Sequence, residues 1–117
     1  MVPLKKKSEL IPLLNVLKSL KSTDRVIILA HLDDNTRDDL YLTIESVLQS
    51  DKVPFEARIK LQKKLSPHKE QLRHIVDKSV SKQVKKKKLN QLGGNPLKLI
   101  LNSALPLMLG QFPLNKQ

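Results

Sequence analysis

Apolar positions recur at helical spacing from near the start of the chain. Four leucines stand at i, i+3, i+4 and i+7, namely Leu10, Leu13, Leu14 and Leu17. This spacing places them on one face of an α-helix. Ser8 is a suitable N-cap, and Pro12 then falls within the first turn or so, where a missing backbone N–H is tolerated. The pattern therefore predicts an amphipathic helix that begins at Ser8.

The next apolar run, residues 26–32, is denser and allows two interpretations. It follows Ser22-Thr23-Asp24, residues of the kind that cap helices. Most positions in the run are apolar, so a buried strand also fits. We favour a helix, because no partner strand with hairpin residues stands elsewhere in the sequence.

A third helix is predicted after the polar segment 33–36, which combines turn and capping residues. Beyond it, apolar residues repeat at i, i+4, i+7 and i+8, namely Leu40, Ile44, Val47 and Leu48. Asp38 and Asp39 near the start of this segment suit the positive end of a helix dipole.

The second half also has the pattern of short helices. Pro54 suits a first helical position, and an apolar stripe follows it at Ala57, Leu61 and Leu65. Ser66-Pro67 ends that helix and opens the next, whose inward positions are Leu72, Ile75, Val76 and Val80. A basic helix then covers residues 84–89, and Gly93-Gly94 stops it.

The segment 96–110 is almost entirely apolar, with Lys98 as its one charge. Asn95 and Pro96 suit a cap and first turn, and Pro106 is expected to kink or end the helix. About 15 residues span roughly 22 Å as a helix, which is short of a bilayer core. Its apolar face suits core packing, an oligomer contact or shallow membrane insertion. The residues concerned are Leu97, Ile100, Leu101, Leu105 and Met108.

The chain of 117 residues is long enough for one domain. The pattern predicts an all-α fold, a small bundle of four to five short helices with a basic helix or arm and an apolar C-terminal helix. We expect residues 1–80 to form the bundle, residues 81–94 the basic helix or arm with a Gly-Gly hinge, and residues 95–117 the apolar segment.

Few residues are available for chemistry. Cysteine and tryptophan are absent, which excludes a disulfide framework, a zinc knuckle and a thiol nucleophile. The histidines, His31, His68 and His74, lack the spacing of a shared metal site. No Ser/His/Asp arrangement or phosphate-binding loop is visible, so we predict a non-enzymatic protein without metal or cofactor. Polar residues interrupt the apolar stretch after the basic N-terminus, which argues against secretion.

Charge divides the chain near Lys52. Residues 1–51 carry seven Lys/Arg against eight Asp/Glu, a net of −1, whereas residues 52–117 carry fifteen against three, a net of +12. A dense field of one sign repels itself within a compact fold. Such a field commonly persists because a polyanion neutralises it, and nucleic acid is the commonest polyanion.

We therefore predict that the second half binds nucleic acid. Lysine outnumbers arginine by 18 to 4, and lysine meets phosphate as a point charge, so little sequence preference is expected. Three aromatic residues, Tyr41, Phe55 and Phe112, are too few for a base-stacking platform. A solvated surface that only aids solubility is the alternative. The candidate contacts are Arg58, Lys60, Lys63, Lys64, Lys69, Arg73, Lys78, Lys82, Lys85, Lys86, Lys87 and Lys88.

Gly93 and Gly94 separate the basic region from the apolar segment. The simplest interpretation is a helix C-cap and hinge. The alternative is a site of proteolytic processing, because an accessible glycine pair has no side chains to obstruct a narrow protease cleft.

A resemblance to a known group of proteins covers about residues 40–112. It rests on the order of several short pieces, which are Val53-Pro54, Lys63-Lys64-Leu65, His68-Lys69, Leu72-Arg73, Lys85-Lys86-Lys87-Lys88-Leu89, Gly93-Gly94 and Pro96-Leu97 with an aliphatic tail. In this order the chain resembles small proteins of Polinton/Maverick-type elements and adintovirus-like viruses of animals. These viruses are similar to adenoviruses, whose small basic core proteins condense the genome and whose protease trims precursors at Gly-Gly sites.

The resemblance implies a core or minor virion protein that condenses or packages DNA, with residues 85–88 on the DNA and Gly93-Gly94 as a maturation site. The adenovirus-type protease favours an aliphatic residue two positions before the glycine pair, where this chain has Gln91. The nucleic acid to expect is DNA rather than RNA. Other possible partners are an anionic membrane surface, capsid proteins or a second copy of the chain. The implied location is the virion and host nucleus, or the nucleus or cytoplasm if the chain is not viral. Two alternatives stay open, a membrane-active virion protein acting through the apolar segment and a helical protein–protein interaction module.

Overall fold

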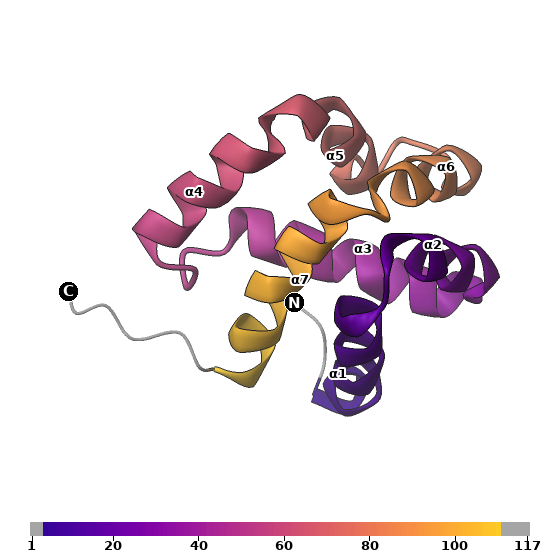
Figure 1. Cartoon of the computed structure of the whole chain (residues 1–117), viewed down its shortest axis with the longest axis horizontal. Coiled ribbons are helices and arrows are strands. Elements are labelled where there is room, and N and C mark those ends of the chain that lie inside the picture. Colours follow the sequence, from indigo (N-terminus) through magenta and orange to yellow (C-terminus); the bar gives the residue numbers. More distant parts are fainter. Residues whose placement is uncertain (1–3, 111–117) are drawn as a thin grey trace.

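Seven α-helices and one 3-10 turn make up the part of the chain that the structure describes (Figure 1). It is a computed structural model that describes the backbone of residues 4–110 and the side chains of residues 9–110. The elements are α1 (Leu4–Ser19), α2 (Ser22–His31), α3 (Asp34–Gln49), α4 (Phe55–Leu65), η1 (Ser66–His68), α5 (Lys69–Val76), α6 (Lys82–Leu92) and α7 (Asn95–Leu109). Residues 4–110 contain no strand, so the predicted all-α class is confirmed. The end of the predicted apolar segment, residues 111–117, lies outside the described residues.

The order of the helices follows the prediction. Five helices, α1 to α5, precede the basic helix α6 and the apolar helix α7. The dense apolar run after Ser22 is helical, so the alternative of a buried strand is wrong. Asp33 is the N-cap of α3, and its side chain accepts a hydrogen bond from the backbone N–H of Thr36 at 2.9 Å, as capping chemistry requires.

Two prolines lie deeper in their helices than predicted. Helix α1 begins at Leu4, well before the expected cap at Ser8, so Pro12 lies in the helix interior. Helix α7 does not end at Pro106 but continues to Leu109, and Gly110, with a φ of 67°, is its C-cap. Proline costs a helix one hydrogen bond and a clash with the preceding turn. Burial of the leucines on either side offsets that cost in both helices.

Helix α7 forms the centre of the core. It packs against α1, α3 and α4, and Figure 1 shows it in the middle of the molecule. Its buried positions repeat at helical spacing, namely Leu97, Ile100, Leu101, Ala104 and Leu105. Burial of each leucine or isoleucine contributes about 1.5–3 kcal/mol. Of the roles left open for this apolar face, core packing is therefore the one that it occupies in this structure.

Arg25 in α2 is the largest fully buried side chain in the described part of the chain, with 1% of its surface exposed. Its guanidinium donates four hydrogen bonds, all to backbone carbonyls. Nε donates to Leu17 at 2.7 Å and Nη2 to Leu20 at 2.6 Å. Nη1 donates to Gly93 at 2.9 Å and to Gly94 at 3.0 Å.

The four carbonyls belong to the ends of two helices. Leu17 and Leu20 lie at the C-terminus of α1, and Gly93 and Gly94 directly follow α6. Carbonyls at a helix C-terminus lack intrahelical donors and carry the negative end of the helix dipole. A guanidinium offers five donors in a fixed planar geometry. Arg25 therefore satisfies both helix ends and ties the α1–α2 connection to the α6–α7 connection.

Replacing Arg25 with methionine removes the four donors but keeps a long, flexible apolar side chain. Because the carbonyls are then left largely buried and unpaired, we expect Arg25→Met to lower the free energy of unfolding by about 3–5 kcal/mol. Urea denaturation followed by circular dichroism measures this loss. Arg73→Met, at an exposed position of α5, is the matched control and should change the free energy by less than about 0.5 kcal/mol. A loss below about 1 kcal/mol for Arg25→Met contradicts a central role for the four hydrogen bonds of the Arg25 guanidinium.

Candidate nucleic-acid interface

The twelve predicted contact residues lie on α4, α5, α6 and the α5–α6 connection. Figure 1 shows these helices following one another along one edge of the molecule. Nine of the twelve are exposed, namely Lys60, Lys63, Lys64, Lys69, Arg73, Lys78, Lys82, Lys86 and Lys87. The other three, Arg58, Lys85 and Lys88, are half-buried.

The core-facing stripe of each helix decides which way its cations point. The buried residues are Leu61 and Leu65 in α4, Leu72 and Ile75 in α5, and Leu89 and Leu92 in α6. Because one stripe of each helix is buried, the remaining positions face water. Lys60, Lys63 and Lys64 share the outer face of α4 at i, i+3 and i+4 spacing, and Lys69 and Arg73 are one turn apart on α5.

The four consecutive lysines of α6 divide into two pairs. Lys86 and Lys87 are exposed, whereas Lys85 and Lys88 are half-buried. The ammonium of Lys85 lies 5.7 Å from the centroid of the Tyr41 ring, which is a cation–π contact. The run therefore presents two exposed cations rather than four.

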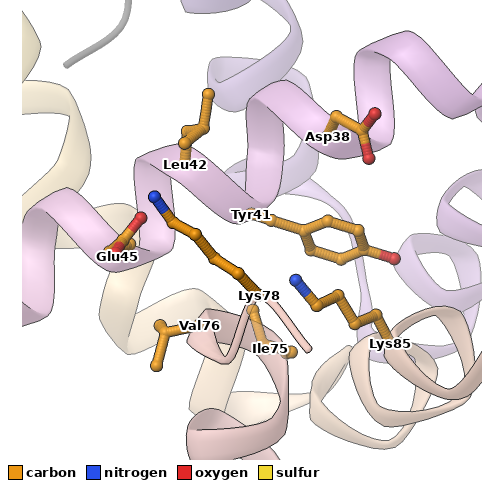
Figure 2. Close-up of a pocket in the computed structure, with 8 residues that line it drawn as sticks. All are labelled: Asp38, Tyr41, Leu42, Glu45, Ile75, Val76, Lys78 and Lys85. Carbon is orange, nitrogen blue, oxygen red and sulfur yellow. The ribbon is translucent and has the colours of Figure 1, made fainter. Parts of the chain in front are cut away.

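A groove of about 210 Å³ lies between α3 and the α5–α6 region (Figure 2). Its lining consists of Asp38, Tyr41, Leu42 and Glu45 on α3 and of Ile75, Val76, Lys78 and Lys85 opposite. Lys82 Nζ forms an ion pair with Asp38 Oδ2 at 3.2 Å, and Figure 2 shows Lys78 extending along the groove toward Glu45. Acidic side chains of the first half thus meet basic side chains of the second half here. Lys78, Lys82 and Lys85 are therefore partly neutralised by their own protein.

Arg58 has a structural role. Its Nη2 donates to the carbonyl of Ser50 at 2.7 Å and to that of Val53 at 3.2 Å, which closes the α3–α4 connection.

Of the twelve predicted contact residues, seven are exposed and neither line the groove nor pair with Asp38. We call them the outer cations: Lys60, Lys63, Lys64, Lys69, Arg73, Lys86 and Lys87. Within residues 9–110 none of the outer cations forms an ion pair with a carboxylate.

The predicted hinge or processing site, Gly93-Gly94, is held by Arg25, because both glycine carbonyls accept hydrogen bonds from its guanidinium. Gly93 is the C-cap of α6 and is buried, and Gly94 is half-buried. A Cβ atom at Gly93 would lie 2.7 Å from Val26 Cγ2, closer than real side chains approach. Hinge motion or proteolysis at this pair therefore requires these contacts to open first.

The five residues predicted for a membrane or oligomer contact lie on α7. Leu97, Ile100, Leu101 and Leu105 are buried, and Met108 is half-buried. Contact with lipid or a second copy through the four buried side chains requires α7 to leave the core. Among the helices of residues 4–110, none has the length and apolar character needed to cross a bilayer.

Sequence reasoning did not single out Arg25, Arg37 or the hydroxyl of Tyr41. Arg37 is buried and donates from Nη1 to Asp34 Oδ1 at 2.9 Å, and the Tyr41 hydroxyl is buried without a hydrogen-bond partner. All three share one signal in the sequence. Each is a polar or amphipathic side chain that stands at a core-facing position of an otherwise apolar helical stripe.

Comparisons of the chain with protein families, with curated proteins and with solved structures find no match. In the described part of the chain, no three His, Cys, Asp or Glu side chains are grouped so that they could hold a metal ion.

Tyr41 is the one tyrosine in the sequence, so phenolate absorbance reports this site alone. Burial raises the pKa of Tyr41 from its ordinary value of 10.0 to about 12, against the opposing charge of Arg37. Because the folded-state pKa exceeds the unfolded one, the stability that this group contributes is complete below pH 10 and is lost as the pH rises through 12. Ultraviolet titration should give a midpoint of about 12 for the native protein and about 10 in urea. Equal midpoints would place the ring in water.

Adding a single methyl group at Gly93 should destabilise the fold. Gly93→Ala forces the new Cβ against the stiff, β-branched side chain of Val26, which we expect to cost about 1–3 kcal/mol. Val26→Ala removes the obstructing methyl group, so the double variant should lose less stability than the two single losses added together. Urea denaturation of the four proteins measures this coupling. Strictly additive losses contradict a direct clash.

Proposed function

We propose that this protein is a non-enzymatic nucleic-acid-binding protein that contacts phosphates with little regard to sequence. The observation that supports the proposal is the set of outer cations, which have no carboxylate partner within residues 9–110. Like charges held on one fold repel one another. A phosphate backbone relieves that repulsion at several points at once and releases counterions.

The chemistry of the outer cations favours contact with phosphates over recognition of particular bases. Six of the seven are lysines, and Arg73 is the one guanidinium among them. A lysine ammonium on a flexible stem meets phosphate as a point charge, whereas recognition of a particular base relies on bidentate donors. We therefore expect similar affinity for unrelated sequences.

The size of the protein suits coating of a duplex. Its longest dimension is 41 Å, close to the ~34–36 Å of one helical turn of DNA. A protein whose contacts do not depend on sequence can bind at successive turns along a long duplex. This fits the role in DNA packaging that the resemblance to small basic virion proteins suggests.

Affinity for duplex DNA should fall steeply with salt. If the outer cations neutralise seven phosphates, the slope of log K against log salt is about −6. Fluorescence anisotropy with labelled duplexes of about 20 base pairs and unrelated sequence, at several salt concentrations, measures it. A slope shallower than about −2 would remove the proposed function. So would a large difference in affinity between sequences.

Two pairs of charge variants distinguish the effect of the cations' position on DNA affinity from the effect of net charge. Lys86→Gln combined with Lys87→Gln removes two outer cations and should reduce the steepness of the slope by about 2 for every sequence. Lys18→Gln combined with Lys21→Gln removes the same charge beside the α1–α2 turn and should change the slope much less. Equal effects of the two pairs would mean that net charge alone sets the affinity.

A further inference from the structure

Helix α4 carries an exposed apolar pair, and one of its outer cations, Lys63, lies on the same side. Phe55 is 72% exposed, the highest value for a large apolar side chain in the described part of the chain, and Ile59 is 42% exposed. The two residues are one turn apart, and Lys63 continues the same line one turn later. The buried residues of this helix, Leu61 and Leu65, lie opposite Lys63 and to one side of Phe55.

The backbone beneath Phe55 is held in place. Phe55 is the first residue of α4, and Pro54 before it is the N-cap with its φ restricted by the ring. Val53 is buried, and the hydrogen bonds from Arg58 to the carbonyls of Ser50 and Val53 close the turn. The phenyl ring therefore projects from a fixed scaffold, which lowers the entropic cost of binding through it.

The surroundings of the ring are mainly cationic. Lys52 is exposed in the connection before α4, and Lys60 and Lys63 are exposed on the helix. Two exposed carboxylates accompany them, Asp51 in the connection and Glu56 on the helix. An aromatic ring among cations suits nucleotides, whose bases stack on rings while their phosphates meet ammonium groups. A lipid surface fits less well, because an interfacial helix needs a continuous apolar face. On α4, charged positions interrupt the apolar face within one turn of Ile59.

We propose that Phe55 stacks on an exposed nucleobase while Lys63, on the same side of α4, holds a flanking phosphate and the other outer cations contact phosphates farther along the strand. This inference rests on the proposed function and adds a base contact to it. Bases in a duplex already stack on one another, so the contact is available in single strands and at unpaired positions. Every base has a π-face, so one stacking contact adds affinity without sequence preference.

A tryptophan at position 55 reports the contact directly. Tryptophan is absent from the chain, so Phe55→Trp introduces a single indole fluorophore. Oligothymidylate should quench its emission as the complex forms, because the base stacks on the indole. Inorganic polyphosphate has the charge but no base, and it should bind without quenching. Unchanged emission in a saturated complex with oligothymidylate overturns the inference.

Truncation of the ring should weaken binding of nucleic acid but not of phosphate chains. We expect Phe55→Ala to reduce the affinity for oligothymidylate about 5- to 100-fold. Its affinity for polyphosphate and its salt slope should be unchanged. Ile27→Ala is the matched control, because Ile27 is 58% exposed on α2, and it should change neither affinity. Circular dichroism confirms that both exposed-site variants fold.

The outcomes distinguish this inference from the proposed function. If both polyanions bind with steep salt dependence and Phe55→Ala has no effect, the stacking contact is overturned and the proposed function stands. If neither polyanion binds but duplex DNA does, the stacking contact alone is overturned. If duplex DNA does not bind either, both are overturned. If the emission of Phe55→Trp responds to vesicles of phosphatidylserine and phosphatidylcholine but not to oligothymidylate, α4 is a lipid contact and the inference is overturned.

Discussion

The buried guanidinium of Arg25 is the interaction on which the rest of the arrangement depends. It joins the carbonyls at the end of α1 to those that follow α6, and so fixes where α6 ends and α7 begins. Helix α7 supplies the centre of the core, and α6 carries part of the basic edge. A charge is stable at this position because helix-end carbonyls replace the water it has lost. Arg25, from residues 1–51, thereby helps to position the basic helix α6 of the second half.

The imbalance of charge along the sequence is partly compensated within the fold. Asp38 and Glu45 of α3 line the same groove as Lys78 and Lys85, and Lys82 pairs with Asp38. The cations beyond the reach of α3 stay in water, where a high dielectric and salt weaken their mutual repulsion. The proposed polyanion interface thus consists of those cations of α4, α5 and α6 that the carboxylates of α3 do not neutralise.

Helical periodicity predicted most elements, because each helix buries one stripe of apolar residues. Helix α1 extends farther before Pro12 than predicted, and helix α7 does not end at Pro106. In both helices the local preference of proline was outweighed by burial of flanking leucines that only the tertiary structure reveals. The outward direction of the lysines on α4 also follows from periodicity. The link from Arg25 to Gly93 and the contact of Lys85 with the Tyr41 ring join residues far apart in the sequence. The hydrogen bonds of Arg58 span a shorter stretch, but they follow no helical repeat. No local pattern contains them.

The most direct measurement is the protection of individual lysines from acetylation when a polyanion is bound. Limited acetylation with and without saturating random-sequence duplex, read by mass spectrometry, reports the accessibility of each ammonium group. We expect strong protection of the outer lysines, Lys60, Lys63, Lys64, Lys69, Lys86 and Lys87. Lys18 and Lys21 should be modified at nearly the same rate in both samples. Protection spread evenly over all lysines, or confined to α1 and α2, would contradict a phosphate-binding edge on α4, α5 and α6.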